Sequence, residues 1–286
     1  MFIDPIIMQM DESIDRERFV IATYYCGAKP TTNMMKFAAA LAEEQTTGTW
    51  IQVPGETPEV RERCIGRLVG VYETPAYQIG VPSEAEERHF IVRIAYPWAN
   101  FGAQFAMMLS TVIGNISSSG KVKLLDLSFP PSFLAQFKGP KFGVQGIRKL
   151  LGVWDRPLLN NMIKPCTGLN PEETAKLAYE AAVGGVDIIK DDELVADAPH
   201  CPLVPRVKAV MEAVRRADEV KGEKTLYAFN ITDRVDRLRD NAMRALDAGA
   251  NCLMVNYFTI GLDAARMLAE DPDINVPILA HSDFTG

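Results

Sequence analysis

The sequence predicts an α/β protein in two parts. Residues 1–138 are expected to form an N-terminal α+β domain of the ferredoxin-like type. Residues 139–286 are expected to supply about five strands of a (β/α)8 TIM barrel. Two observations support this prediction. In the first part, hydrophobic residues recur at strand-like and helix-like spacings in the order β-α-β-β-α; after Gly139, predicted strands alternate with predicted helices.

The N-terminal elements follow from composition and period. Residues 19–25 (FVIATYY) are β-branched and aromatic, which favours a strand, and residues 64–72 and 89–95 are further predicted strands. Apolar residues recur at helical spacing in residues 32–44 and 101–113, which predicts two helices. An antiparallel sheet covered on one face accounts for this order.

The second part begins with a short predicted helix at residues 146–152. Asn170-Pro171-Glu172-Glu173 is a strong helix start, with Asn as N-cap, Pro at the first helical position and Glu at the third. Strands are predicted at residues 158–163, 186–189, 225–231, 252–257 and 276–280, and helices from 205 to about 220, 236–248 and 262–270. This alternation indicates a parallel sheet.

Each predicted strand of the second part ends in a polar or charged residue. These residues are Lys164, Lys190, Asn230, Asn256 and His281. In a (β/α)8 barrel the carboxyl ends of the strands form the active site. Strand ends are also polar where they merely meet water, but five in succession favour a site.

The sequence ends at Gly286, soon after the fifth predicted strand. A complete barrel needs about 250 residues, so we expect a barrel truncated within the chain. The alternatives are an open doubly wound sheet or completion by another polypeptide. The inner face, assigned to Ile188, Leu226, Val255 and Ile278, would be uncovered. We therefore expect residues 1–286 alone to be inactive, and to aggregate or need a partner.

Composition excludes several classes of protein. The formal net charge is −7 and no basic stripe occurs, which argues against nucleic-acid binding. No apolar run is long enough to span a bilayer and no signal peptide is recognisable, so we expect a cytoplasmic protein with no membrane contact. The five cysteines include no CxxC pair, which makes a zinc site unexpected and fits a reducing compartment.

The segment with the most chemistry is residues 184–193, GGVDIIKDDE. Asp192 and Glu193 follow a buried strand, and two carboxylates with further oxygens make a site for a hard cation such as Mg²⁺. Lys190 beside them is unsuited to bind a cation unless CO₂ converts its amine to a carbamate. The alternative is a solvated surface cluster of charges.

GGVDIIKDDE resembles the metal-binding segment of the RuBisCO large-chain family and its RuBisCO-like members. The resemblance implies that Lys190 is carbamylated and binds Mg²⁺ with Asp192 and Glu193. Lys164, in Ile163-Lys164-Pro165, matches a lysine that contacts the substrate and moves its protons. His281 matches a histidine at the end of the fifth barrel strand.

Two N-terminal segments extend the resemblance over nearly the whole chain. Residues 44–50 (EQTTGTW) resemble a loop that reaches the active site of a neighbouring subunit, where Glu44, Thr49 and Trp50 match substrate-binding positions. Asn115, after Gly114, matches an asparagine of the same intersubunit site. The resemblance therefore implies a homodimer with shared active sites and a phosphorylated small-molecule substrate.

Departures from the carboxylating enzymes argue against CO₂ fixation. Cys166 stands where those enzymes have a second lysine, and Ser282 stands where they have a phosphate-binding arginine. Asn115 also replaces a lysine base of the methionine-salvage enolases. We therefore expect another RuBisCO-like branch, such as an isomerase of methylthioribulose phosphate or a decarboxylase or transcarboxylase of a branched 3-oxo sugar-acid phosphate.

These features predict Mg²⁺-dependent enolisation of a phosphorylated keto-sugar or 3-oxo sugar-acid by an isomerase, enolase or decarboxylase. Mg²⁺ would stabilise negative charge on the enediolate, and either Lys164 or the Lys190 carbamate would move the proton. One alternative is a Schiff-base aldolase that uses Lys164 or Lys190. Others are an inactive fragment or pseudoenzyme and, less favoured, a true carboxylase.

Overall fold

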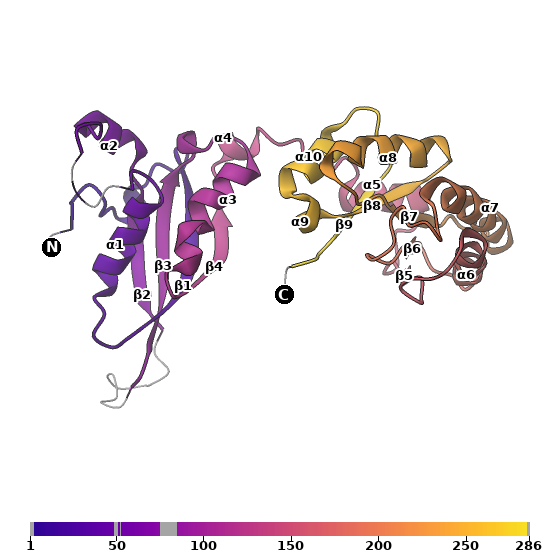
Figure 1. Ribbon diagram of the computed structural model, residues 1–286, viewed down its shortest axis with the longest axis horizontal. Helices are drawn as coiled ribbons and strands as arrows, with labels where there is room; N and C mark the ends of the chain where they lie inside the picture. Colours follow the sequence, from indigo (N-terminus) through magenta and orange to yellow (C-terminus); the bar gives the residue numbers. More distant parts are fainter. Residues whose placement is uncertain (1–2, 49–50, 52, 75–84, 285–286) are drawn as a thin grey trace. The chain divides into compact units, whose positions relative to one another are not determined.

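The computed structural model describes residues 3–48, 51, 53–74 and 85–284. The chain forms two compact units, Met1–Phe137 and Lys138–Gly286, and each unit has a hydrophobic core of its own. Figure 1 shows the helices and strands of each unit along the chain.

The first unit contains a four-stranded antiparallel sheet in the order β2-β3-β1-β4. The chain order is β1, α1, β2, β3, α3, β4, which is the ferredoxin-like order, so the predicted fold class of this unit is confirmed. The bounds are β1 Phe19–Ala28, α1 Met34–Glu44, β2 Arg67–Glu73, β3 Arg88–Pro97, α3 Phe105–Ile113 and β4 Lys121–Ser128, with shorter helices η1 Asp11–Ser13, α2 Pro58–Cys64, η2 Trp98–Asn100, η3 Asn115–Ser118 and α4 Pro131–Leu134.

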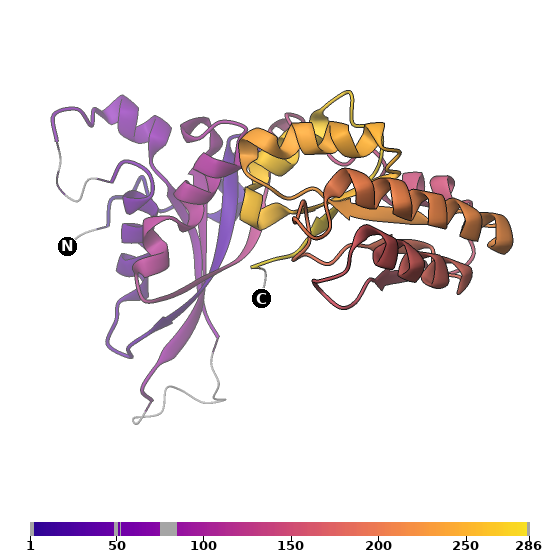
Figure 2. The same cartoon turned by 45° about the vertical axis from the view of Figure 1, so that its right-hand side comes forward.

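Helices α1 and α3 lie on the same face of this sheet (Figures 1 and 2). Tyr24 of β1 and Ile94 of β3 point to that face and are fully buried against Ala38 of α1 and Met108 of α3. Alternate residues of each strand therefore supply the core, as the period of two requires.

Strand β4 was not predicted from the sequence. It lies at the edge of the sheet and pairs with β1 alone. The register shifts between Thr23 and Tyr24, opposite Leu124 and Asp126, so Leu125 is an extra residue. Such a bulge breaks the alternation of apolar and polar residues that marks a strand in a sequence.

The second unit contains a curled parallel sheet of five strands in the order β5-β6-β7-β8-β9. This arrangement confirms the predicted part of a (β/α)8 barrel. The strands are β5 Asn160–Met162, β6 Ile188–Lys190, β7 Leu226–Asn230, β8 Cys252–Asn256 and β9 Ile278–His281; the helices are α5 Gly143–Leu151, α6 Pro171–Val183, α7 Leu203–Lys221, α8 Val235–Asp247, α9 Tyr257–Ile260 and α10 Leu262–Glu270.

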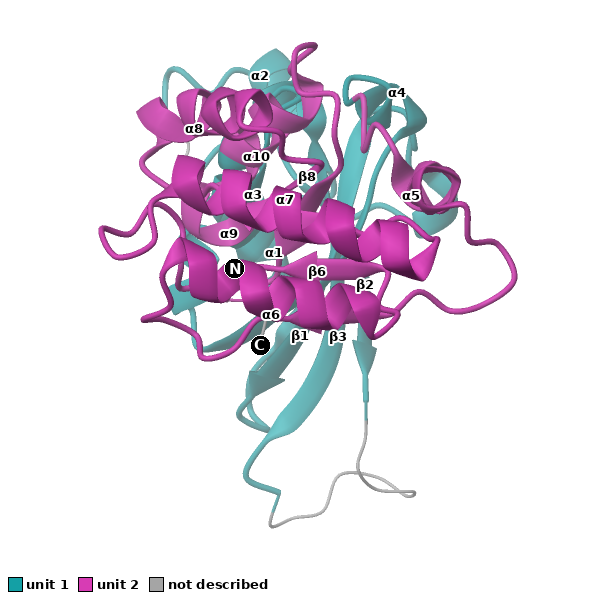
Figure 3. Ribbon diagram, turned by 90° about the vertical axis from the view of Figure 1, so that its right-hand side faces the viewer, with its two compact units in different colours: residues 1–137 teal, residues 138–286 magenta. Residues whose placement is uncertain are grey.

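Helices α6, α7 and α8 run side by side over one face of this sheet (Figure 3). Tyr227 and Val255 point to these helices, whereas Leu226 and Met254 point to the opposite face, where they pack near Leu151 of α5. The prediction that Val255 and Ile278 face inward is therefore wrong, because both belong to the helix-facing set. Leu226 and Ile188 do lie on the inner face.

Candidate active site

The polar residues that follow the strands of the second unit meet at the carboxyl edge of its sheet. Met162 pairs with Lys190, and Asn256 pairs with His281. Asn230 and Asn256 lie an even number of residues after the inward-facing Leu226 and Met254, so they share the inner face. The period of two thus explains why these polar side chains converge.

Glu193, just after β6, is the centre of these contacts. Its Oε2 lies 3.3 Å from Lys190 Nζ and 3.3 Å from His281 Nε2. Its backbone carbonyl accepts hydrogen bonds from Asn256 Nδ2 at 3.0 Å and Asn230 Nδ2 at 3.2 Å. Elements far apart in the sequence, β6, β7, β8 and β9, therefore hold one glutamate.

Lys164 and Asp192 form the second pair of the site. Lys164 Nζ donates to Asp192 Oδ2 at 2.6 Å and to Cys166 Sγ at 3.0 Å. The Asp192 side chain is 2% exposed, whereas that of Lys164 is 51% exposed. Asp192 is therefore a buried group at the base of the pair, and about half of the Lys164 side chain is open to solvent.

The two acids and Lys164 are held in their charged forms. The hydrogen bond to Asp192 raises the pKa of Lys164 well above its usual value. Burial alone would raise the pKa of Asp192, but hydrogen bonds from Lys164 and from the backbone N–H of Leu194 outweigh it and lower the pKa. The backbone N–H of Glu193 lowers the pKa of its own carboxyl group, with help from Lys190. The cluster therefore balances ammonium groups against carboxylates.

His281 lies between two acidic side chains. Its Nε2 faces Glu193, and its Nδ1 lies 2.7 Å from Asp283 Oδ1. Asp283 was not among the predicted site residues, although it lies two residues after His281. An acid on Nδ1 orients the imidazole ring toward Glu193.

Asp191 points away from this cluster, behind the acidic segment. Its carboxylate accepts from Tyr227 OH at 2.7 Å and from the backbone N–H of Asn230 at 2.8 Å, and lies 3.1 Å from Arg206 Nη2. Sequence reasoning missed this role for Arg206. The signal was its position within the apolar stripe of α7, three residues after Leu203 and one before Val207, which places it on the buried face.

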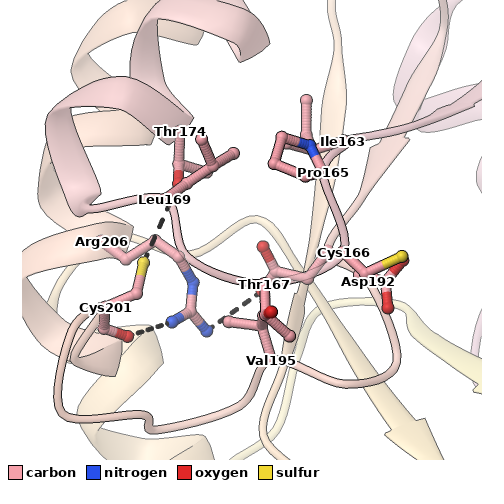
Figure 4. Close-up of a pocket in the computed structure, with 11 residues that line it drawn as sticks. Ile163, Pro165, Cys166, Thr167, Leu169, Thr174, Asp192, Val195, Cys201 and Arg206 are labelled. Carbon is pink, nitrogen blue, oxygen red and sulfur yellow. Dashed lines mark hydrogen bonds and ion pairs between the residues drawn. The ribbon is translucent and has the colours of Figure 1, made fainter.

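A small cavity of about 20 Å³ lies beside the site (Figure 4). Cys166 and Asp192 approach one another on one side of it, and the guanidinium group of Arg206 lies near Thr167 and Cys201 on the other. The loop between β5 and α6 forms part of its wall. His200 supports that loop by accepting a hydrogen bond from Gly168 N–H at 3.2 Å.

The predicted substrate-binding residues of the first unit are partly described. Glu44 ends α1 and Asn115 begins η3, and Asn115 Nδ2 donates to Glu44 Oε1 at 3.4 Å. The structure thus brings together two residues that lie far apart in the sequence. Thr49 and Trp50 lie outside the described residues.

The side chains of the site fit a divalent cation only in part. Within the described part of the chain, no three His, Cys, Asp or Glu side chains are grouped to hold a metal ion. Asp192 and Glu193 supply two carboxylates, but the third neighbouring side chain is the ammonium group of Lys190. The residues therefore suit a hard cation only when Lys190 carries an acidic group, as the carbamate hypothesis requires.

Comparison with known families covers most of the chain. Residues 143–283 match the catalytic domain of the ribulose bisphosphate carboxylase large chain, and residues 10–133 match the N-terminal domain of the same large chain. The two matches fall within the two structural units, in the same order.

Two curated relatives illustrate the range of similarity. A ribulose bisphosphate carboxylase-like protein of Archaeoglobus fulgidus is 55% identical over 97% of this chain and 63% of its own length. A 2,3-diketo-5-methylthiopentyl-1-phosphate enolase of Bacillus licheniformis is 40% identical over 93% of this chain and 64% of its own length. The chain thus spans less than two thirds of each of these relatives.

Solved structures agree with the sequence relatives. A RuBisCO-like protein from Alicyclobacillus acidocaldarius has a TM-score of 0.81 and 34% identity, covering 94% of this chain and 65% of its own. Octameric ribulose-1,5-bisphosphate carboxylase/oxygenase from Pyrococcus horikoshii has a TM-score of 0.84 and 29% identity, and the match covers 97% of this chain and 63% of the other. None of the described helices is both long and apolar enough to cross a bilayer.

Proposed function

Because this chain belongs to the RuBisCO large-chain family, in its RuBisCO-like branch, we propose that it forms part of an enzyme that enolises a phosphorylated keto-sugar or 3-oxo sugar-acid without fixing CO₂. The supporting observation is the convergence of Lys164, Lys190, Asp192, Glu193 and His281 at the carboxyl edge of one sheet. In barrels of this kind that edge carries the chemistry.

The charges of the cluster support the carbamate hypothesis for Lys190. Two ammonium groups, Lys164 and Lys190, now face two carboxylates, Asp192 and Glu193. The Lys190 ammonium group first loses one proton; the free amine then attacks CO₂, an N–C bond forms, and a second proton leaves for solvent. A positive group thereby becomes a negative one, which leaves the cluster with the excess charge that one Mg²⁺ neutralises.

The roles proposed for the protein's own groups follow from their placement. Carbamylated Lys190, Asp192 and Glu193 would hold Mg²⁺, which when bound polarises a ketone and its neighbouring hydroxyl. Lys164, whose side chain is half exposed beside Asp192, would meet the substrate. Once Asp192 binds the cation and releases the Lys164 amine, this amine would move the proton on the carbon next to the ketone. His281, oriented by Asp283, would hold Glu193 in position.

The metal site is tested by isothermal titration of the intact protein with MgCl₂, with and without bicarbonate. We expect Mg²⁺ to bind more tightly when bicarbonate is present, and Asp192→Ala to abolish the binding, because it removes one of two carboxylate ligands. Glu172→Ala, an exposed acid on α6, is the matched control and should bind like the wild type. Unchanged binding in Asp192→Ala would refute the site.

The reaction is tested by deuterium exchange in D₂O, followed by NMR at the carbon next to the ketone. The two compounds offered as substrates are 2,3-diketo-5-methylthiopentyl-1-phosphate and ribulose-1,5-bisphosphate. We expect Mg²⁺-dependent exchange with a phosphorylated ketone and no incorporation of labelled CO₂ into the bisphosphate. Labelled product would reverse the choice between the branches, and a substrate adduct trapped by borohydride without Mg²⁺ would support the Schiff-base alternative instead.

A further inference from the structure

Asp191 is anchored through all of its hydrogen-bonding groups. Its amide N–H donates to the carbonyl of Ala228 at 3.0 Å, and its own carbonyl accepts from Lys190 Nζ at 3.2 Å. Its carboxylate is 3% exposed; it accepts hydrogen bonds from the Tyr227 hydroxyl group and the Asn230 amide, and it forms an ion pair with Arg206. Fixing the middle of the segment in this way limits the backbone torsions of the residues on either side.

The carboxylate of Asp191 is therefore not available to a cation. Both of its oxygens already accept hydrogen bonds, and one of them faces a guanidinium group that is itself completely buried. Asp192, by contrast, is paired with a lysine whose side chain is 51% exposed and free to turn away. The two adjacent aspartates thus have different surroundings.

Arg206 has a limited set of partners in the described part of the chain. Nη1 donates to the carbonyl of Cys201 at 2.7 Å. Nη2 faces Asp191 and also donates to the carbonyl of Asn230 at 3.5 Å, while Nε has no hydrogen-bond partner. Burial would lower the pKa of Arg206, but the charge of Asp191 outweighs it and raises the pKa, so the guanidinium remains charged. Its only ionic partner among the described residues is Asp191.

We propose that Arg206 and Tyr227 are positioning residues for the metal-binding segment. They hold Asp191 behind the segment, so that Lys190 on one side and Asp192 and Glu193 on the other project to the carboxyl edge. This inference rests on the function proposed for that edge. Neither residue contacts the substrate; both act through Asp191.

The test compares Mg²⁺ affinity, measured by titration with bicarbonate, among variants of the intact protein. Arg206→Met removes the ionic partner and keeps the buried volume, and Tyr227→Phe removes a single hydroxyl group. Loss of such an outer partner weakens metal binding by about 10- to 100-fold, and we expect this for Arg206→Met, a smaller loss for Tyr227→Phe, and partial recovery in Arg206→Lys.

Two controls separate positioning from simple stabilisation. Val210→Ala destabilises the same helix without touching Asp191, and Tyr24→Phe removes a buried hydroxyl group from the first unit. Both should keep wild-type Mg²⁺ affinity at a temperature where circular dichroism shows every variant folded. Wild-type affinity in folded Arg206→Met would overturn the proposal.

Hydrogen exchange of the Asn230 amide gives a second readout that needs no metal. This amide donates to Asp191 Oδ2 at 2.8 Å, so faster exchange in Arg206→Met, with unchanged exchange in Val210→Ala, would show that Asp191 has moved. Unchanged protection would refute the positioning role. If the wild type binds no Mg²⁺, the proposed function fails, and the exchange result still decides the role of Arg206.

Discussion

Asp187, three residues before Lys190, ties the start of β6 to the loop that precedes β5. Its carboxylate accepts from Arg156 Nη1 at 2.7 Å and Nη2 at 2.8 Å, and from the backbone N–H of Leu159 at 2.8 Å. Burial opposes ionisation, but these three donors outweigh it and lower the pKa of Asp187. A bidentate pair of this kind also fixes direction, so it orients the strand that carries Lys190.

Asp187→Asn should change the acid sensitivity of the protein. A carboxylate with a lowered pKa stabilises the fold above its unfolded pKa of about 3.9, and this stability is lost as pH falls through the lower folded value. We therefore expect Asp187→Asn to be less stable than the wild type near neutral pH, with the difference shrinking below about pH 4. Urea unfolding at several pH values measures this.

The control for this prediction is Asp247→Asn, at an exposed position at the end of α8. This substitution removes the same charge from a residue that has no buried partner within the described ranges. The free energy of unfolding of this variant should therefore match that of the wild type at every pH. A difference between Asp187→Asn and the wild type that stays constant through the acid range would contradict the linkage.

The cysteines should divide into two classes of reactivity. Cys64 and Cys166 are partly exposed, while Cys26, Cys201 and Cys252 are buried. Burial raises the pKa of Cys26 to about 11 and that of Cys252 to about 12. Because the thiolate is the reactive form, we expect Ellman's reagent to modify two thiols rapidly in the native protein and all five in denaturant. Rapid reaction of more than two would show that a core is open.

At the scale of elements, α6 begins with a complete capping box. Asn170 Oδ1 accepts from Glu173 N–H at 2.9 Å, and Glu173 Oε2 accepts from Asn170 N–H at 2.9 Å. Asn170→Ala should therefore destabilise the protein by about 1 kcal/mol, as measured by urea unfolding. Lys176→Ala, at an exposed position within α6, is the control and should change little. Equal stability of the two variants would mean that the cap does not contribute.

This capping box was predictable because all its residues are adjacent in sequence. Strands β6 to β9 were predictable for a related reason: each is a short, mainly apolar run between helical segments. The orientation of β8 and β9 was not, since both strands are apolar on both faces up to their last residue and their sequences carry no alternation. The polar residues Asn256 and His281 mark the inner face of their strands. Because successive residues of a strand point to opposite faces, Val255 must face the helices.

The candidate site shows the same limit. Lys190, Asp192 and Glu193 were predicted from one continuous segment, and their polar neighbours from the ends of strands. The pattern of α7 places Arg206 on the buried face, but its contact with Asp191, and that of Tyr227, depend on how α7 packs on β7 and cannot be predicted from pattern or spacing. The contact between Glu44 and Asn115 followed only from the family resemblance, because nothing local to either residue indicates it.

At the scale of the whole molecule, the family resemblance implies that the proposed site takes residues from both units. Glu44 and Asn115 belong to the first unit, and Lys164, Lys190 and Asp192 belong to the second. The resemblance implies that a homodimer completes each site with the first unit of the partner subunit. In such a dimer, a variant inactivated in its first unit and a variant inactivated in its second unit should complement one another, because a mixed dimer contains one intact site.

Mixing Lys164→Met with Asn115→Ala tests this arrangement. Each variant alone should lose Mg²⁺-dependent deuterium exchange. After subunit exchange, half of the dimers are mixed, and each mixed dimer has one site with both defects and one with neither. We therefore expect about a quarter of the wild-type exchange rate to return. Lys164→Met mixed with Asp192→Ala is the control, since both defects lie in the second unit and no intact site can form. Recovery in neither mixture, despite proven subunit exchange, would mean that each site is built within one chain.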